Sequence, residues 1–422
     1  MRRQGFGTVA AAVGALLGAL AFLPAMAQET AQEAWSLDGL VRERATYQSA
    51  IAFDEDDPDA GWFWSQRISL TGRYQSEGPI SGSVTLLSAY QRGIEDSPVE
   101  RNDLDIQEGF LRFSGGSSWL QLGRQELILG SQRFLGSRDG TNVRRTWDGV
   151  RAATSLGDWQ LQAFGVQLVD VESSGAFNDS SDSDRVIAGL YGTGALAGTG
   201  LDLYYLYSRF DDRATIEGVA DQERHTIGAR AFGQRDALFW NWEAAWQFGD
   251  HGDADIEAWT LATNTGLRLD SAWSPELMLS VNVASGDERR DDGELGTFDA
   301  LYPRGNYFSE LALLGPANFF NVNPYLRLAP SDQLAVSFDI NWFWRLEEAD
   351  GVYGPPGNVL RRPLGSDERF VNTAVSFTVD WTPAPNWLLG ASFSYSRPED
   401  FIQETGPADS TGFVQLTAQV SF

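Results

Sequence analysis

Most of this chain is built from short segments in which apolar and polar residues alternate. From Val414 to Phe422 every second residue is apolar, and the residues between them are Gln, Thr or Ser. Residues 334–344 and 371–381 repeat the pattern. A period of two places all apolar side chains on one face of a β-strand. A strand with one apolar face and one small, polar face suits a position between lipid and a water-filled interior.

The same alternation predicts eighteen strands along the chain. They are expected at 41–53, 62–74, 80–91, 104–113, 118–127, 149–156, 159–169, 185–193, 200–209, 223–232, 239–248, 256–267, 276–285, 318–328, 334–345, 370–381, 387–396 and 413–422.

The connections between these segments alternate in length. Residues 114–117 and 157–158 are short connections, whereas 128–148 and 286–317 are long. An even number of antiparallel strands, with short turns at one rim and long loops at the other, is typical of outer-membrane barrels. We therefore predict an all-β transmembrane antiparallel barrel in the outer membrane, with both chain ends on the periplasmic side.

The tryptophans fit this prediction. Trp62 and Trp64, for example, are two residues apart near the end of a predicted strand, where barrels carry aromatic girdles. A water-soluble sandwich with a Trp-rich core is the alternative. Its polar faces would be charged and rich in Lys, and this chain has no Lys.

The first residues are typical of an exported protein. Residues 1–27 combine an Arg pair, an apolar stretch and a Pro-Ala-Met-Ala cleavage motif, which predicts a signal peptide. We assign 28–40 to a short periplasmic leader and 41–422 to the barrel. No window contains about 18 consecutive apolar residues, so a chain that spans a membrane with helices is excluded.

Composition narrows the chemistry further. The chain has no Cys, two His and a formal net charge of −27. These numbers exclude a cysteine nucleophile and a Cys-based metal site, and they argue against a nucleic acid partner. Many acids lie in predicted long connections, such as 54–57 and 291–294. We interpret these as solvated outer loops, with bridging to lipopolysaccharide by divalent cations left open.

The basic residues are distributed differently, and all of them are arginines. Residues 124–151 contain six arginines but only three acids, Glu126, Asp139 and Asp148. A long connection inside a compact fold is usually functional or disordered, and barrels of this size commonly fold one loop into the lumen. The six are Arg124, Arg133, Arg138, Arg144, Arg145 and Arg151.

Other arginines alternate along predicted strands and should point inward, because an Arg facing lipid at mid-bilayer costs about 2–4 kcal/mol. The planar guanidinium matches a carboxylate bidentately. Binding of an anionic substrate and pairing with acids of the barrel wall, such as Asp105, Glu108, Glu243, Asp339 and Asp380, both remain open. The arginines concerned are Arg42, Arg44, Arg67, Arg73 and Arg230.

Two segments resemble the alginate export family of outer-membrane barrels. The first is LGRQELILGSQRFLGSRDGTNVRRTWDGVRA, residues 122–152, with a GRQ-type strand end, an Arg-rich loop and a WDGVR strand start. The second is FDALYPRGNYFSELALLGPANFFNVNPYLRLAP, residues 298–330, with a Tyr-Pro segment at a similar place.

The resemblance implies an eighteen-stranded monomeric barrel that passes alginate through an electropositive constriction. It makes Arg124, Arg133, Arg144, Arg145 and Arg151 the constriction residues. Family positions that use Lys must differ here, and the shorter chain predicts trimmed loop gates. A periplasmic tetratricopeptide scaffold accompanies alginate exporters, although no residue of this chain requires one.

We therefore predict a passive channel for an anionic polysaccharide or oligosaccharide, working without cofactor or metal. A general or small-anion porin for organic acids is the main alternative, and a non-transporting adhesion barrel is another. An enzyme is disfavoured, because His225 and His251 are the only histidines and no Gly-x-Ser-x-Gly motif occurs.

Overall fold

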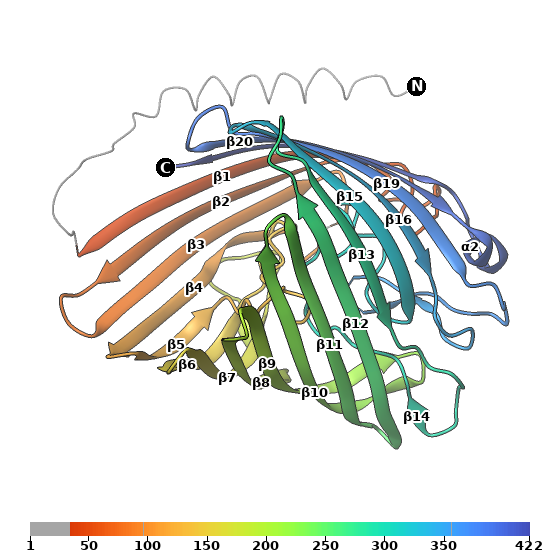
Figure 1. Ribbon diagram of the computed structural model, residues 1–422, viewed down its shortest axis with the longest axis horizontal. Helices are drawn as coiled ribbons and strands as arrows, with labels where there is room; N and C mark the ends of the chain where they lie inside the picture. The colour runs from red at the N-terminus through yellow and green to blue at the C-terminus, as the bar shows by residue number, and fades with distance from the viewer. Residues whose placement is uncertain (1–33, 96, 356) are drawn as a thin grey trace.

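The alternating segments pair with one another in chain order and close into a barrel (Figure 1). The computed structural model describes residues 34–95, 97–355 and 357–422. Eighteen antiparallel strands form the wall, and pairing of the first with the last completes it. Every strand edge is thereby hydrogen-bonded, as a wall in lipid requires.

The barrel strands are β1 (Trp35–Gln48), β2 (Gly61–Gln75), β3 (Ile80–Arg92), β4 (Asn102–Gly115), β5 (Ser118–Gln125), β6 (Trp147–Leu156), β7 (Trp159–Asp170), β8 (Ser180–Leu196), β9 (Thr199–Thr215), β10 (Gly218–Arg235), β11 (Leu238–His251), β12 (Ala254–Arg268), β13 (Glu276–Ala284), β15 (Phe319–Ser331), β16 (Leu334–Trp344), β19 (Phe370–Trp381), β20 (Trp387–Pro398) and β21 (Thr411–Ser421). Short elements in the connections are β14 (Glu294–Leu295), β17 (Val352–Tyr353), β18 (Val359–Arg361) and the helix α2 (Asp400–Thr405). Within the described part of the chain, no helix has the length and apolarity to cross a membrane.

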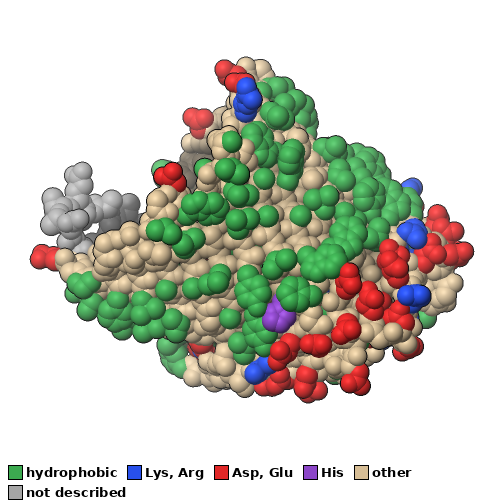
Figure 2. Space-filling model, turned by 60° about the horizontal axis from the view of Figure 1, so that its bottom comes forward, with side chains coloured by type: hydrophobic (Ala, Val, Ile, Leu, Met, Phe, Trp, Pro, Cys, Tyr) green, Lys and Arg blue, Asp and Glu red, His purple; other side chains and the backbone are tan. Residues whose placement is uncertain are grey.

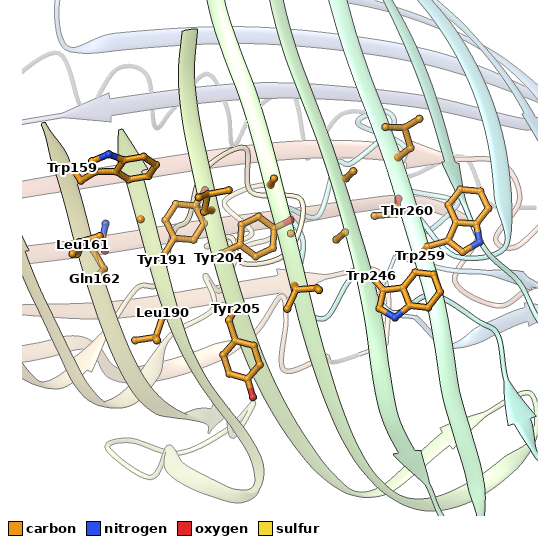
Figure 3. A pocket seen from close by; sticks show the side chains of 18 residues that line it. Trp159, Leu161, Gln162, Leu190, Tyr191, Tyr204, Tyr205, Trp246, Trp259 and Thr260 are labelled. Carbon is orange, nitrogen blue, oxygen red and sulfur yellow. The ribbon is translucent and has the colours of Figure 1, made fainter. Parts of the chain in front are cut away.

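The outer wall is apolar and exposed, as the alternation predicts. Leu203 and Leu261 are nearly half exposed, whereas their strand neighbours Asp202 and Ala262 are buried toward the interior. Small residues in the same row, such as Ala244, leave a hollow of about 1180 Å³ on the outer wall. Figure 3 shows the side chains around this hollow, which come from β7 to β12. So much exposed apolar surface fits contact with lipid.

The two rims differ as predicted, with two exceptions. The short turns, the start of β1 and the end of β21 lie at one rim, and acidic side chains gather at the opposite, loop-bearing rim (Figure 2). However, the connections after β9 and β11 at the loop rim contain only two residues each. The predicted strands 200–209 and 223–232 were therefore too short. Both strands extend beyond the apolar belt. There they have polar residues on both faces, such as Asp211 and Arg213 of β9, so the alternation ends before the strand does.

The predicted start of the first strand is also wrong. Strand β1 covers Trp35–Gln48 rather than 41–53, so residues 35–40 of the predicted leader are part of the wall. Trp35 and Leu37 are exposed on the outer side, but Gly39 and Glu43 interrupt the apolar face and hide the pattern. The predicted signal peptide, 1–27, and the leader residues 28–33 lie outside the described residues.

Two long connections fold inward and form a core within the barrel. Leu127, Phe134 and Leu135 of the loop 126–146 are buried together with Phe298 and Leu301 of the loop 285–318. This cluster packs against inward side chains of β7 to β9, β11 to β13, β15, β16, β19 and β21. The lumen is therefore partly filled by apolar packing.

Closure of the wall predicts a sensitive position at Gly39. The amide and carbonyl groups of Gly39 and Phe422 exchange two hydrogen bonds of 2.6 and 2.9 Å, and a side chain at Gly39 would collide with the Phe422 ring. We expect Gly39→Val to reduce the fraction of heat-modifiable, folded barrel on electrophoresis. Gly72→Val is the control, because nothing lies within 4 Å of its Cβ position. Equal folding of both variants would contradict the prediction.

Candidate functional site

The arginine-rich loop 126–146 crosses the lumen and is tied to opposite walls. On one side, Nη1 of Arg133 donates to Glu243 of β11 at 2.9 Å. On the other, the Asn142 amide donates to the carbonyls of Gln66 at 2.7 Å and Glu100 at 3.0 Å. The prediction of an inward loop is thus confirmed in its geometry.

Arg42 and Arg67 anchor this loop to β1 and β2. Both side chains are almost completely buried, at 2% and 4% exposure. Arg42 donates to the carbonyls of Asp139 and Thr141 at 3.0 and 2.7 Å. Arg67 donates to the Asn142 carbonyl and the Asp139 carboxylate, both at 2.7 Å. Burial would raise the pKa of Asp139, but the neighbouring Arg67 lowers it, so the pair stays ionised.

Six of the predicted arginines pair with acids: Arg67, Arg73 and Arg144, which pair with Asp139, Asp38 and Glu126, and three more on the wall and the loop. Arg124 forms two 3.0 Å bonds with Asp148, Arg133 pairs with Glu243, and Arg230 reaches Asp202 at 2.6 Å. Arg124 also does not point into the lumen. Alternation places it on the face of Leu122, which is exposed on the outer wall. Its charge is tolerated there because Asp148 and Asp105 surround it.

Arg138 and Arg145 lie within the folded loops. Burial lowers the pKa of Arg138 to about 10. Burial, together with Arg138, lowers the pKa of Arg145 well below its ordinary value. Arg145 lies 4.7 Å above the Tyr302 ring and donates to the Pro303 carbonyl at 3.2 Å, so it joins the two inner loops.

Four predicted arginines remain on the accessible side of the lumen. Arg44 bonds only to the carbonyl of Gly140, and Arg73 is half exposed beside Asp38. Arg144 is 29% exposed and pairs with Glu126 at 2.8 Å. Arg151 bonds to the neutral Gln162. These side chains share one wall with the loop anchors, from β1 to β6.

Sequence reasoning missed two members of this wall. Arg112 of β4 stands between Leu111 and Phe113, which are both exposed outward, so it points into the lumen. Trp119 of β5 lies next to it, with its ring 4.4 Å from the Arg112 guanidinium. The alternation of β4 and β5 carried the signal for both, because it places Arg112 and Trp119 on the inward face of their strands.

Acids lie on another part of the wall. Asp339 of β16 accepts a 3.1 Å hydrogen bond from Asn323, and Asp380 of β19 shares the inward alternation of Ala374 and Ser376. Arg327 of β15 lies on the same inward face near Asp380, so this part carries both signs of charge, whereas arginines predominate on β1 to β6. A solute with carboxylates is therefore attracted more strongly to the wall of β1 to β6.

The two histidines lie in different surroundings. His225 lies on the outer wall, where its ring stacks with Phe248 at 5.0 Å and its Nδ1 lies 2.7 Å from the Tyr205 hydroxyl. His251 is buried, with its Nε2 3.1 Å from the Thr215 hydroxyl. In residues 34–95, 97–355 and 357–422, no set of three His, Asp or Glu is arranged to hold a metal ion.

Loss of the Arg67 anchor should loosen the inner loop. Arg67→Ala removes four hydrogen bonds to residues 139–142 and should destabilise the attached loop by about 2–4 kcal/mol. We expect larger and noisier single-channel conductance in planar bilayers. Arg235 is exposed at the end of β10, so the conductance of Arg235→Ala should equal that of the wild type. An unchanged conductance and noise level in Arg67→Ala would refute the anchoring role.

Glu126 should make the passage respond to pH. Burial raises the pKa of Glu126 to about 7, although Arg144 beside it acts in the opposite direction. Below pH 7 the carboxyl is protonated and leaves Arg144 uncompensated, so the passage gains about one positive charge. The anion-to-cation permeability ratio should rise as pH falls from 8 to 6. In Glu126→Gln the permeability ratio should stay at its low-pH value from pH 8 to pH 6. A change of the ratio with pH in this variant would contradict the assignment to Glu126.

Comparison with known proteins agrees with this architecture. The sequence model of the alginate export family matches residues 30–414. No curated protein sequence matches the chain significantly. Among solved structures, Pseudomonas aeruginosa OccD3 (OpdP) is similar with a TM-score of 0.64 at 12% identity, covering 92% of this chain and 91% of that one.

Two further structures are similar to the same extent. Pseudomonas aeruginosa OccK2 (OpdF) in complex with glucuronate has a TM-score of 0.62 at 12% identity, covering 94% of this chain and 99% of that one. Acinetobacter baumannii OccAB3 has a TM-score of 0.62 at 12% identity, with 92% and 99% covered. At these identities the similarity establishes the fold, which is that of outer-membrane channels.

Proposed function

Because the chain belongs to the alginate export family, we propose that this outer-membrane channel conducts an anionic, alginate-like polyuronate through an arginine-lined constriction. The observation that carries the proposal is the arginine wall of β1 to β6, which faces a lumen whose outer rim is acidic.

The arginines divide into two roles in this proposal. Arg42, Arg67, Arg138 and Arg145 hold the inner loops, and their charges orient the backbone rather than the solute. Arg44, Arg73, Arg144 and Arg151 contact the passing carboxylates. The compensated Arg124, Arg133 and Arg230 stiffen the wall.

Conduction then follows from exchange between several weak sites. A carboxylate replaces water on one guanidinium, with which it can form two parallel hydrogen bonds, and moves to the next. Multiple sites of moderate affinity let a solute both enter and leave. Asp339 and Asp380 on β16 and β19 repel the polymer, although Arg327 beside them offsets part of this repulsion, and the polymer follows the arginines of β1 to β6. No nucleotide, metal or covalent step is required.

A small-anion channel for organic acids is the second candidate. The observation in its favour is the apolar cluster of the loops 126–146 and 285–318, which occupies part of the lumen and narrows the passage. The same arginines would then bind single carboxylates. The acidic rim would face lipopolysaccharide in both cases, and the barrel would act as a monomer, with a periplasmic scaffold as an optional partner.

Electrophysiology separates these candidates. In a salt gradient, the reversal potential should show preference for chloride over potassium. Oligomannuronate should block the ion current, whereas a neutral dextran of similar size should not. A cation-selective wild-type channel would overturn the proposal. Block by small organic acids without any block by oligomannuronate would replace it with the second candidate.

A further inference from the structure

Two arginines flank a tryptophan on the lumenal wall near the periplasmic rim. Arg112 of β4, Trp119 of β5 and Arg151 of β6 lie on three consecutive strands. The guanidinium carbons of Arg112 and Arg151 lie 4.4 and 5.6 Å from the centre of the Trp119 ring. The turns after β4 and β6 are at the rim where β1 starts and β21 ends, so this group lies at the periplasmic mouth.

Only neutral groups hold the two guanidiniums in place. Arg112 donates to Oε1 of Gln121 at 2.9 and 2.5 Å. Arg151 donates to Oε1 of Gln162 at 3.1 and 2.5 Å. Among the described residues, neither arginine has a carboxylate within 4.0 Å. Both charges are therefore oriented but not compensated.

On the other barrel strands, the described arginines that lie over an aromatic ring are paired with acids, as Arg213 is with Asp299. Arg230 lies 4.0 Å over Phe232 and pairs with Asp202, and Arg268 lies 4.3 Å over Phe239 and pairs with Glu276 at 2.7 Å. Both combine a ring with an acid. At Arg112 and Arg151 the ring is present and the acid is missing, although two like charges on alternate strands repel each other.

Both arginine side chains are partly exposed. Arg112 lines a lumenal hollow of about 400 Å³ together with Ser81, Ser83, Phe110 and Glu108, whose carboxylate lies beyond ion-pair distance. Arg73, on the opposite side of this hollow, is half exposed. A hydrated solute can therefore reach the guanidiniums from the periplasmic side.

We propose that Arg112, Trp119 and Arg151 form a subsite that binds two carboxylates of one polyuronate chain as it passes the periplasmic mouth. The inference rests on the proposed function and adds a defined place and stoichiometry to it. Arg112 and Arg151 bind the carboxylates. Trp119 is a positioning residue, since its ring keeps the two guanidiniums apart and oriented.

The geometry predicts dependence on ligand length. Two strands of separation place the arginine backbones about 10 Å apart. A linear polyuronate carries one carboxylate on each ring, so a short oligomer can engage both guanidiniums, whereas a single uronate engages one. The second contact is then intramolecular and strengthens binding without any new residue.

The test compares the block of single-channel current by oligomannuronate and by glucuronate, each added from the periplasmic side. The variant Arg112→Gln/Arg151→Gln should raise the half-blocking concentration of oligomannuronate at least about tenfold, with a smaller change for glucuronate. Arg268→Gln is the matched control, because it removes a ring-stacked arginine that is already compensated, and its block should equal that of the wild type.

Further outcomes separate this inference from the proposed function. If oligomannuronate blocks the wild type and the double variant equally, the subsite is refuted while the polyuronate channel stands. If it fails to block the wild type, the proposed function itself is refuted. Trp119→Leu should weaken the block and Trp119→Phe should restore it, with heat-modifiable folding unchanged in all variants. Equal block in the Leu and Phe variants would refute the positioning role.

Discussion

A barrel wall is a single layer of strands whose successive side chains point to opposite faces, so each charged side chain lies either against lipid or in the lumen. The cost of a guanidinium in the bilayer sends nearly all wall arginines inward, and the rest of the structure follows from this constraint. Arg42, Arg67, Arg112 and Arg151 all share the lumenal face of their strands. Arg124 is one exception, because it reaches the outer face at the loop-side end of a short strand, enclosed by Asp148 and Asp105.

Once inside, each guanidinium needs acceptors, and the chain supplies them in three ways. Backbone carbonyls of the inner loop serve Arg42 and Arg67, wall carboxylates serve Arg133 and Arg230, and glutamine side chains serve Arg151 and Arg112. The first way fixes a loop, the second stiffens the wall, and the third leaves a charge free for a solute. Residue type alone does not distinguish these roles; the partner does.

This explains how far the sequence could be used for prediction. The strands were predictable because lipid imposes a period of two wherever it touches the wall, and all eighteen were found in their approximate places. The alternation gives no signal where lipid contact ends, as in the projecting ends of β9 and β10. It is also interrupted in β1, where Gly39 and Glu43 lie on the apolar face. The partners of the arginines could not be predicted from the sequence. Arg67 and Asp139, for example, are 72 positions apart and come into contact only because the loop folds inward.

The connection between the two inner loops has a mechanical consequence. Tyr302 exchanges backbone hydrogen bonds with Phe134 and Gly136, Arg304 bonds to Gln132, and Arg145 covers the Tyr302 ring. These bonds make the loops 126–146 and 285–318 one cooperative body, like a short piece of sheet inside the barrel. Such a body shifts as a whole between discrete positions instead of flexing residue by residue, so the aperture beside it changes in steps.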